Sequence, residues 1–132
     1  MVDFMQDVDL CELEDIYELA AKAREDGIKV QPRPKSQWYR VGDKGIVCLW
    51  EPQNRNGTMR ISHWWVDEDH HGEGVGSALL DRAIFDADNT AGARVIDIYV
   101  HDPEPFRERG FEEAEGGNPG RGITYMSRTI PE

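Results

Sequence analysis

A glycine-rich turn between a strand and a helix constrains the fold of this chain more than any other feature. Residues 58–66 are rich in β-branched and aromatic side chains, which predicts a strand. Apolar residues share one face over about 75–89, which predicts a helix, and the apolar run 94–100 predicts another strand. A strand–helix–strand crossover is right-handed and joins parallel strands. The chain must therefore contain at least one parallel pair.

The other segments predict a first helix and several antiparallel strands. An amphipathic helix is predicted over about 9–26, with Asp9 as its N-cap and Gly27 as its stop. An irregular link with two prolines follows over 28–36. The remaining predicted elements are strands over 37–41 and 45–50, a short helix over 102–109, a strand starting at Phe111 and a last strand over 123–130. This order indicates a mixed α/β domain.

Length and composition narrow the class of protein. The 132 residues, of which 39% are hydrophobic, are expected to form a single domain over 1–132. No apolar run approaches the about 20 residues of a membrane-spanning helix, and residues 1–5 lack the features of a signal peptide. Cys11 and Cys48 fit neither a disulfide framework nor a zinc motif. Reduced thiols and a cytoplasmic location are therefore expected.

The charge balance argues against nucleic acid and anionic membranes as partners. The 26 acidic residues exceed the 15 basic ones, and the formal net charge is −11. Such a surface attracts amines and basic peptides. Few of the basic residues are lysines. This composition is typical of halophilic proteins, although a GC-rich genome gives the same preference for arginine, so both explanations stay open.

The glycine-rich turn itself predicts an anion-binding site. Glycines let backbone N–H groups approach a ligand closely, and the first turn of the following helix leaves N–H groups unpaired. Together with the helix dipole, these groups bind phosphate or pyrophosphate. No Lys precedes Ser77, as a Walker loop requires, and Gly72, Gly74 and Gly76 lack the spacing of a dinucleotide fingerprint. A purely structural role for the glycines is the alternative.

Three segments together resemble the GNAT N-acetyltransferases. The pattern His71-x-x-Gly74-x-Gly76 is similar to the family's acyl-CoA loop, Arg/Gln-x-x-Gly-x-Gly/Ala, with His71 in place of Arg or Gln. Residues 65–69 stand where the fourth strand of the family ends, and residues 105–111 are similar to its Phe-Tyr-Glu-Lys-Leu-Gly-Phe segment. The order of elements agrees with the family from residue 9 to residue 130.

The resemblance implies a seven-stranded, mostly antiparallel sheet that is splayed between its fourth and fifth strands. It implies acetyl-CoA as the co-substrate, with pantetheine in the splay and paired with the backbone of Trp65 and Val66. The pyrophosphate would lie on the loop, and His71 would add partial positive charge. The cofactor-binding residues implied in this way are Trp65, Val66, His71, Gly72, Glu73, Gly74, Val75, Gly76, Ser77 and Phe106.

The chain departs from the family at both proton-transfer positions. The strand 58–66 has no acid to act as a general base, so His63 is the best candidate base. The alternative is an interior histidine bonded to backbone. Strand alternation predicts that His63 shares a face with Met59, Ile61 and Trp65.

The family's acid, a tyrosine, is replaced by Phe106, which has no proton to donate. Tyr99, His101 or Tyr125 from neighbouring strands, or solvent, are the candidate replacements.

The sequence therefore predicts an acetyl-CoA-dependent N-acetyltransferase that transfers the acetyl group directly to a primary amine. The acceptor would be a small amine or a protein amino group. Two alternatives stay open: a domain that binds acyl-CoA without transfer, and a relative of phage nucleobase-modifying proteins, which the net charge opposes.

No metal site is expected at His70 and His71, because consecutive residues rarely converge on one ion. Family members are often dimers, but no residue here specifies an interface.

Overall fold

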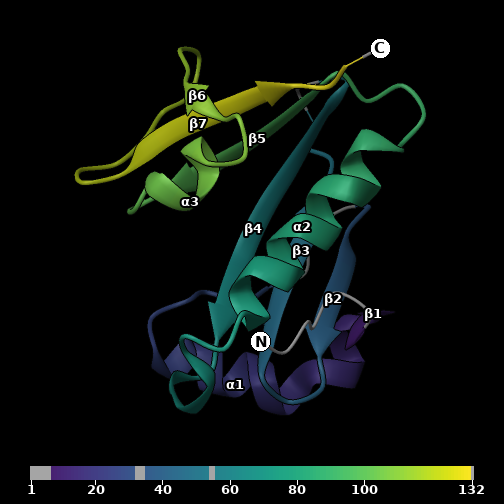
Figure 1. The fold of residues 1–132 in the computed structure, drawn as a ribbon, viewed down its shortest axis with the longest axis vertical. Helices are drawn as coiled ribbons and strands as arrows, with labels where there is room; N and C mark the ends of the chain where they lie inside the picture. Colours follow the sequence, from purple (N-terminus) through teal and green to yellow (C-terminus); the bar gives the residue numbers. More distant parts are fainter. Residues whose placement is uncertain (1–6, 32–34, 54–55, 132) are drawn as a thin grey trace.

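A seven-stranded sheet forms the centre of the computed structural model, which describes residues 7–31, 35–53 and 56–131 (Figure 1). The strands are β1 Val8–Cys11, β2 Gln37–Val41, β3 Gly45–Trp50, β4 Thr58–Val66, β5 Val95–Val100, β6 Glu112–Glu113 and β7 Thr124–Thr129. The sheet order is β1-β2-β3-β4-β5-β7-β6, and β4–β5 is the parallel pair among antiparallel neighbours. This confirms the predicted mixed α/β sheet and its parallel crossover.

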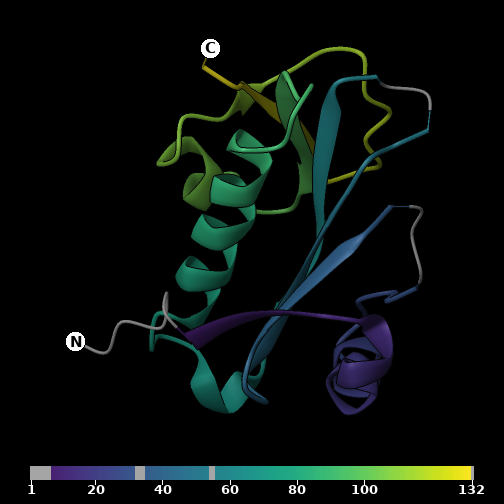
Figure 2. The ribbon, with the colours of Figure 1, turned by 90° about the vertical axis from the view of Figure 1, so that its right-hand side faces the viewer.

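The helices lie on both faces of this sheet. They are the 3₁₀ turns η2 Leu13–Ile16 and η3 Glu68–His70, and the α-helices α1 Tyr17–Glu25, α2 Val75–Asp88 and α3 Glu104–Arg107. Figure 2 shows α1 and α2 on opposite sides of the strands. The helices α1 and α2 cover two separate apolar clusters, so the sheet is packed on both faces. None of the helices described has the length and apolar character needed to cross a membrane.

The predicted first helix is wrong over its first residues. Val8–Cys11 is a strand that pairs antiparallel with β2, and helical structure begins only at Leu13. The pairing buries Val8 in the core, whereas Leu10, which the helical pattern would place inside, is 56% exposed. Strand pairing therefore outweighed the helical periodicity here.

Residues 1–5 and the two prolines of the link, Pro32 and Pro34, lie outside the described residues.

The parallel strands β4 and β5 stay together only at one end. They pair from Thr58 with Val95 to Arg60 with Asp97, and beyond that point they diverge (Figure 1). Asp97 is fully buried and accepts two hydrogen bonds from Arg60, at 2.9 and 2.8 Å. Burial alone would lower the pKa of Arg60, but the hydrogen bonds and charge of Asp97 raise it. A closed ion pair thus occupies the point where the splay begins.

A β-bulge interrupts β4 between Ser62 and Trp65. Cys48 lies opposite Ser62, but Ile46 lies opposite Trp65, so β4 has one residue more than β3 between these two pairs. His63 has a φ of 53°, in the left-handed region. The extra residue shifts every later side chain of β4 to the other face of the sheet.

The predicted alternation along this strand is therefore wrong beyond the bulge. Met59 and Ile61 pack in the cluster under α2, as does the partly buried Trp64, whereas Trp65 packs in the cluster under α1. The ring of His63 lies 5.3 Å from that of Trp38, which belongs to the α1 cluster. His63 and Trp65 therefore do not share a face with Met59 and Ile61. The prediction missed this because a bulge leaves no reliable mark in the sequence.

We expect the ion pair at the splay to act as a unit in stability. Arg60→Met or Asp97→Leu should each lower the free energy of unfolding by about 3–5 kcal/mol, because each leaves a buried charge without its partner. The double variant should lose less than the sum of the two. Urea denaturation measures all three, and strictly additive losses would contradict the interpretation. As a control, Arg107→Met removes an exposed pair and should cost less than about 1 kcal/mol.

Candidate functional site

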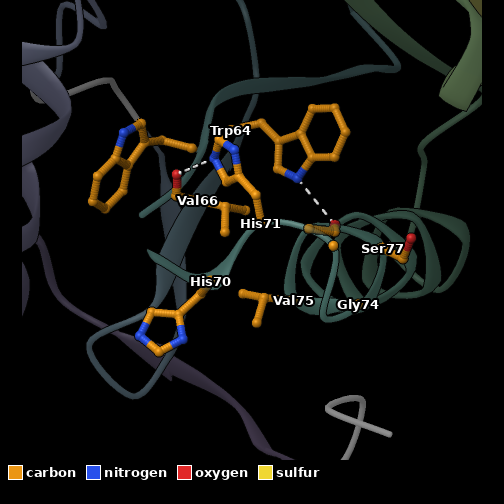
Figure 3. Close-up of a pocket in the computed structure, with 10 residues that line it drawn as sticks. Trp64, Val66, His70, His71, Gly74, Val75 and Ser77 are labelled. Carbon is orange, nitrogen blue, oxygen red and sulfur yellow. Dashed lines mark hydrogen bonds between the residues drawn. The ribbon is translucent and has the colours of Figure 1, made fainter. Parts of the chain in front are cut away.

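A cavity of about 540 Å³ lies between the end of β4 and the start of α2 (Figure 3). Its lining consists of Trp64, Trp65, Val66, His70, His71, Gly72, Gly74, Val75, Gly76 and Ser77. The structure thus brings together nearly all of the residues predicted to bind the co-substrate. Two do not line this cavity: Glu73, which lies beside His70, and Phe106, which lines a second cavity.

The start of α2 faces this cavity with its backbone N–H groups. Gly74 is the N-cap, with a φ of 98° that favours glycine, and no side chain caps the helix there. The first intrahelical bond is donated by Ala78, so the N–H groups of residues 75–77 have no intrahelical acceptor. The first turn carries no acidic residue, so no carboxylate of the helix itself offsets the positive end of the helix dipole. An anion fits this position.

Gly76 has a packing role that is independent of any ligand. The indole of Trp64 donates a hydrogen bond to the Gly76 carbonyl at 3.0 Å. A Cβ at Gly76 would lie 3.2 Å from that ring and 3.3 Å from the side chain of Val66. Gly76 therefore has the structural role that the sequence left open as the alternative, because a side chain here would crowd the contact between the strand end and the helix start.

The two histidines of the loop point away from each other (Figure 3). His71 donates from Nε2 to the carbonyl of Val66 at 2.9 Å, and His70 Nδ1 lies 3.1 Å from Glu73 Oε1. His71 is thus held against the strand end rather than over the helix N-terminus. Within the described residues no group of three or more His, Cys, Asp or Glu side chains could hold a metal ion.

A second cavity, of about 280 Å³, lies between the diverging ends of β4 and β5. Its lining consists of Ile28, Ser62, His63, Trp64, Ile98, Tyr99, Val100, His101, Asp102 and Phe106. The candidate base His63 and two of the candidate acids, Tyr99 and His101, therefore share one cavity. Trp64 lines both cavities, so the two adjoin at this residue.

The other candidate acid, Tyr125, lies behind this cavity. Its hydroxyl donates to Asp97 Oδ2 at 2.6 Å, and its ring lies 4.7 Å from that of Tyr99. Tyr99 lines the cavity, and its oxygen accepts a bond from the Asn118 N–H at 3.3 Å. Phe106 is fully buried against Trp64, with ring centroids 5.4 Å apart. Phe106, at the position where the resemblance implies a tyrosine, is thus part of the packed cavity wall.

Three residues of this region were missed by sequence reasoning. Arg60 and Asp97 form the ion pair at the splay, and Ser62 lines the second cavity beside His63. Asp97 did leave a signal, because a carboxylate inside the apolar run 95–100 needs a buried partner. Ser62 left no signal in the sequence, because its contact with His63 depends on the bulge, which the sequence does not reveal.

The family and fold comparisons agree with this geometry. The model of the acetyltransferase (GNAT) family matches residues 13–111. The N-acetylglutamate synthase of Neisseria gonorrhoeae, solved with coenzyme A and N-acetyl-glutamate, superposes with a TM-score of 0.71 at 21% identity. That match covers 95% of this chain but only 35% of the synthase, so this chain spans a minor part of that protein's length.

Two further solved structures match over nearly their whole length. An acyl-CoA N-acyltransferase from Pseudomonas aeruginosa has a TM-score of 0.70 at 16% identity, covering 92% of this chain and 99% of that one. The IAA acetyltransferase from Bacillus cereus has a TM-score of 0.66 at 16% identity, covering 93% and 98%. At these identities the likeness concerns the fold alone, and no curated protein sequence matches. On the strength of the family match over residues 13–111 and the splayed sheet, the chain belongs to the GNAT acetyltransferase family.

Proposed function

We propose that this chain is an acetyl-CoA-dependent N-acetyltransferase that moves the acetyl group directly to a primary amine. The observation that supports this most is the pair of cavities that adjoin at Trp64. One contains an uncapped helix N-terminus suited to a pyrophosphate, and the other contains a histidine and a tyrosine suited to proton transfer.

The first cavity is proposed to bind the CoA portion. The N–H groups of residues 75–77 would hold the pyrophosphate, and Gly72 and Gly74 would let the loop approach it. The backbone of Trp65 and Val66 would pair with pantetheine like an additional strand. The hydrogen bond from His71 does not prevent this, because the Val66 carbonyl oxygen has a second lone pair.

The second cavity is proposed to hold the reacting groups. His63 would act as the general base for the amine, and a backbone N–H near Trp65 would stabilise the oxyanion. Of the two tyrosines, Tyr99 is proposed as the acid because it lines the cavity, whereas the proton of Tyr125 is held by Asp97.

The acceptor is proposed to be an amine of positive or neutral charge. The formal net charge of −11 favours the approach of cations, and Asp102 lines the cavity. Most of the cavity wall is apolar or aromatic, so the nitrogen would be desolvated where it meets the thioester.

We expect Ser77→Glu to weaken acetyl-CoA binding without weakening the fold. A carboxylate in the first turn of α2 repels the pyrophosphate but interacts favourably with the helix dipole. Calorimetry should show at least about a tenfold loss of affinity, about 1.4 kcal/mol, while the melting temperature stays equal or rises. The neutral Ser77→Gln, of nearly the same size, should keep binding. Equal affinity of Ser77→Glu and Ser77→Gln would contradict the loop assignment.

We expect the natural chain to release free thiol from acetyl-CoA in the presence of an amine. Spermidine, kanamycin, lysine and a peptide with a free amino terminus cover the proposed acceptor classes, and mass spectrometry identifies the acetylated product. Ser77→Glu is the control, and its turnover should be slower at acetyl-CoA concentrations well below saturation. Stoichiometric acetyl-CoA binding without turnover over this panel would instead support a domain that binds acyl-CoA without transfer. The burial of Phe106 at the family's acid position is the observation that favours this second candidate.

A further inference from the structure

The bulge in β4 brings two consecutive polar side chains to the same cavity. Neighbouring residues of a regular strand point to opposite faces. At the bulge, however, Ser62 and His63 both line the cavity between β4 and β5, and Ser62 Oγ lies 2.6 Å from His63 Nδ1. The positive φ of His63 is the backbone conformation that makes this contact. Non-glycine residues held in that region cluster at functional sites.

The hydrogen bonds around this pair determine where the protons lie. His63 Nε2 is 3.2 Å from the carbonyl oxygen of Lys29, and a carbonyl only accepts, so Nε2 carries a hydrogen. In the neutral imidazole the lone pair is then on Nδ1. The indole of Trp50 donates to Ser62 Oγ at 2.9 Å, so that oxygen is already an acceptor. The Ser62 hydroxyl therefore donates its own proton to His63 Nδ1.

This arrangement separates the basic nitrogen from the cavity by one hydroxyl group. The lone pair of His63 points at Ser62, and its other ring nitrogen is bonded to the link after α1. An amine in the cavity would meet the Ser62 oxygen before it could reach the lone pair of His63. The titratable side chains that share the cavity with this pair are Tyr99, His101 and Asp102.

We propose that Ser62 and His63 form a proton relay for the acceptor amine, with the Lys29 carbonyl fixing the tautomer. This rests on the proposed acetyltransferase function. As the amine nitrogen forms its bond to the thioester carbon, its proton passes to Ser62 Oγ while the Ser62 proton passes to His63 Nδ1. The C–S bond then breaks with its electron pair on sulfur, Tyr99 gives its proton to the thiolate, and the proton on the imidazole returns through solvent to Tyr99. Ser62 is the catalytic residue of the relay, and His63 acts through it.

The relay predicts that the two residues are not independent. Ser62→Ala and His63→Gln should each lower kcat by about a hundredfold with the best amine of the panel, and the double variant should be no worse than the poorer single. The rise of kcat/KM as the imidazole loses its proton should disappear in both variants. Affinity for acetyl-CoA, measured by calorimetry, should stay within about twofold, because neither side chain lines the first cavity.

Thr90→Val is the matched control, because it also removes one hydroxyl group and its hydrogen bond, but at a position that lines neither cavity. It should keep kcat within about threefold of the natural chain. The relay is overturned if Ser62→Ala also stays within about threefold, or if the losses of the two single variants multiply. It is equally overturned if mass spectrometry finds an acetyl group on Ser62, which would make that oxygen a nucleophile.

Failure of the proposed function would look different, since the natural chain would then acetylate none of the amines. The tautomer of His63 tests the relay independently of turnover. Nitrogen-15 NMR of the natural chain should show the hydrogen of the neutral ring on Nε2. A hydrogen on Nδ1 would overturn the proposal, because Ser62 could then pass no proton to the ring.

Discussion

The splay between β4 and β5 depends on the buried ion pair between Arg60 and Asp97. This pair joins β4 to β5 at their last paired position, and beyond it the strands diverge around the second cavity. A fully buried carboxylate is stable only with partners of good geometry. Asp97 has three such bonds, two from Arg60 and one from Tyr125, so three strands are tied together at the base of the splay. The splay can therefore be open at one end without loosening the sheet.

The bulge at His63 changes which side chains of β4 point to each face of the sheet. Before it, the strand contributes apolar side chains to the core under α2. After it, Trp64 lies on that face and bonds the first turn of α2, while Trp65 packs under α1 and bonds Asp26 at 2.8 Å. One inserted residue thus connects the end of β4 to both helical layers. It also turns Ser62 and His63 toward the cavity that adjoins the helix N-terminus at Trp64.

Sequence reasoning succeeded where local rules determine the structure. The hairpin strands, α2 and the glycine-rich turn follow from periodicity and turn chemistry, and their predicted bounds differ little from those found. The predictions were wrong or incomplete where pairing between strands distant in the sequence determines the structure. The residues of β1 carry a helical pattern, yet an open edge of β2 makes them a strand. The bulge and the Arg60–Asp97 pair likewise depend on the neighbouring strand, which no short window of the sequence contains.

Phe106, at the position where the resemblance to the family implies a tyrosine, does not leave the proposed reaction short of a proton. Transfer from a thioester to a neutral amine releases one proton from nitrogen and takes up one at sulfur, so the two balance. A thiol ionises near pH 8.5, and its thiolate leaves without prior protonation. The base is therefore the indispensable partner, and an acid only speeds the last step. A fully buried Phe106 then strengthens the cavity wall, where it contacts Trp64 and Phe111, at no cost to the balance of protons.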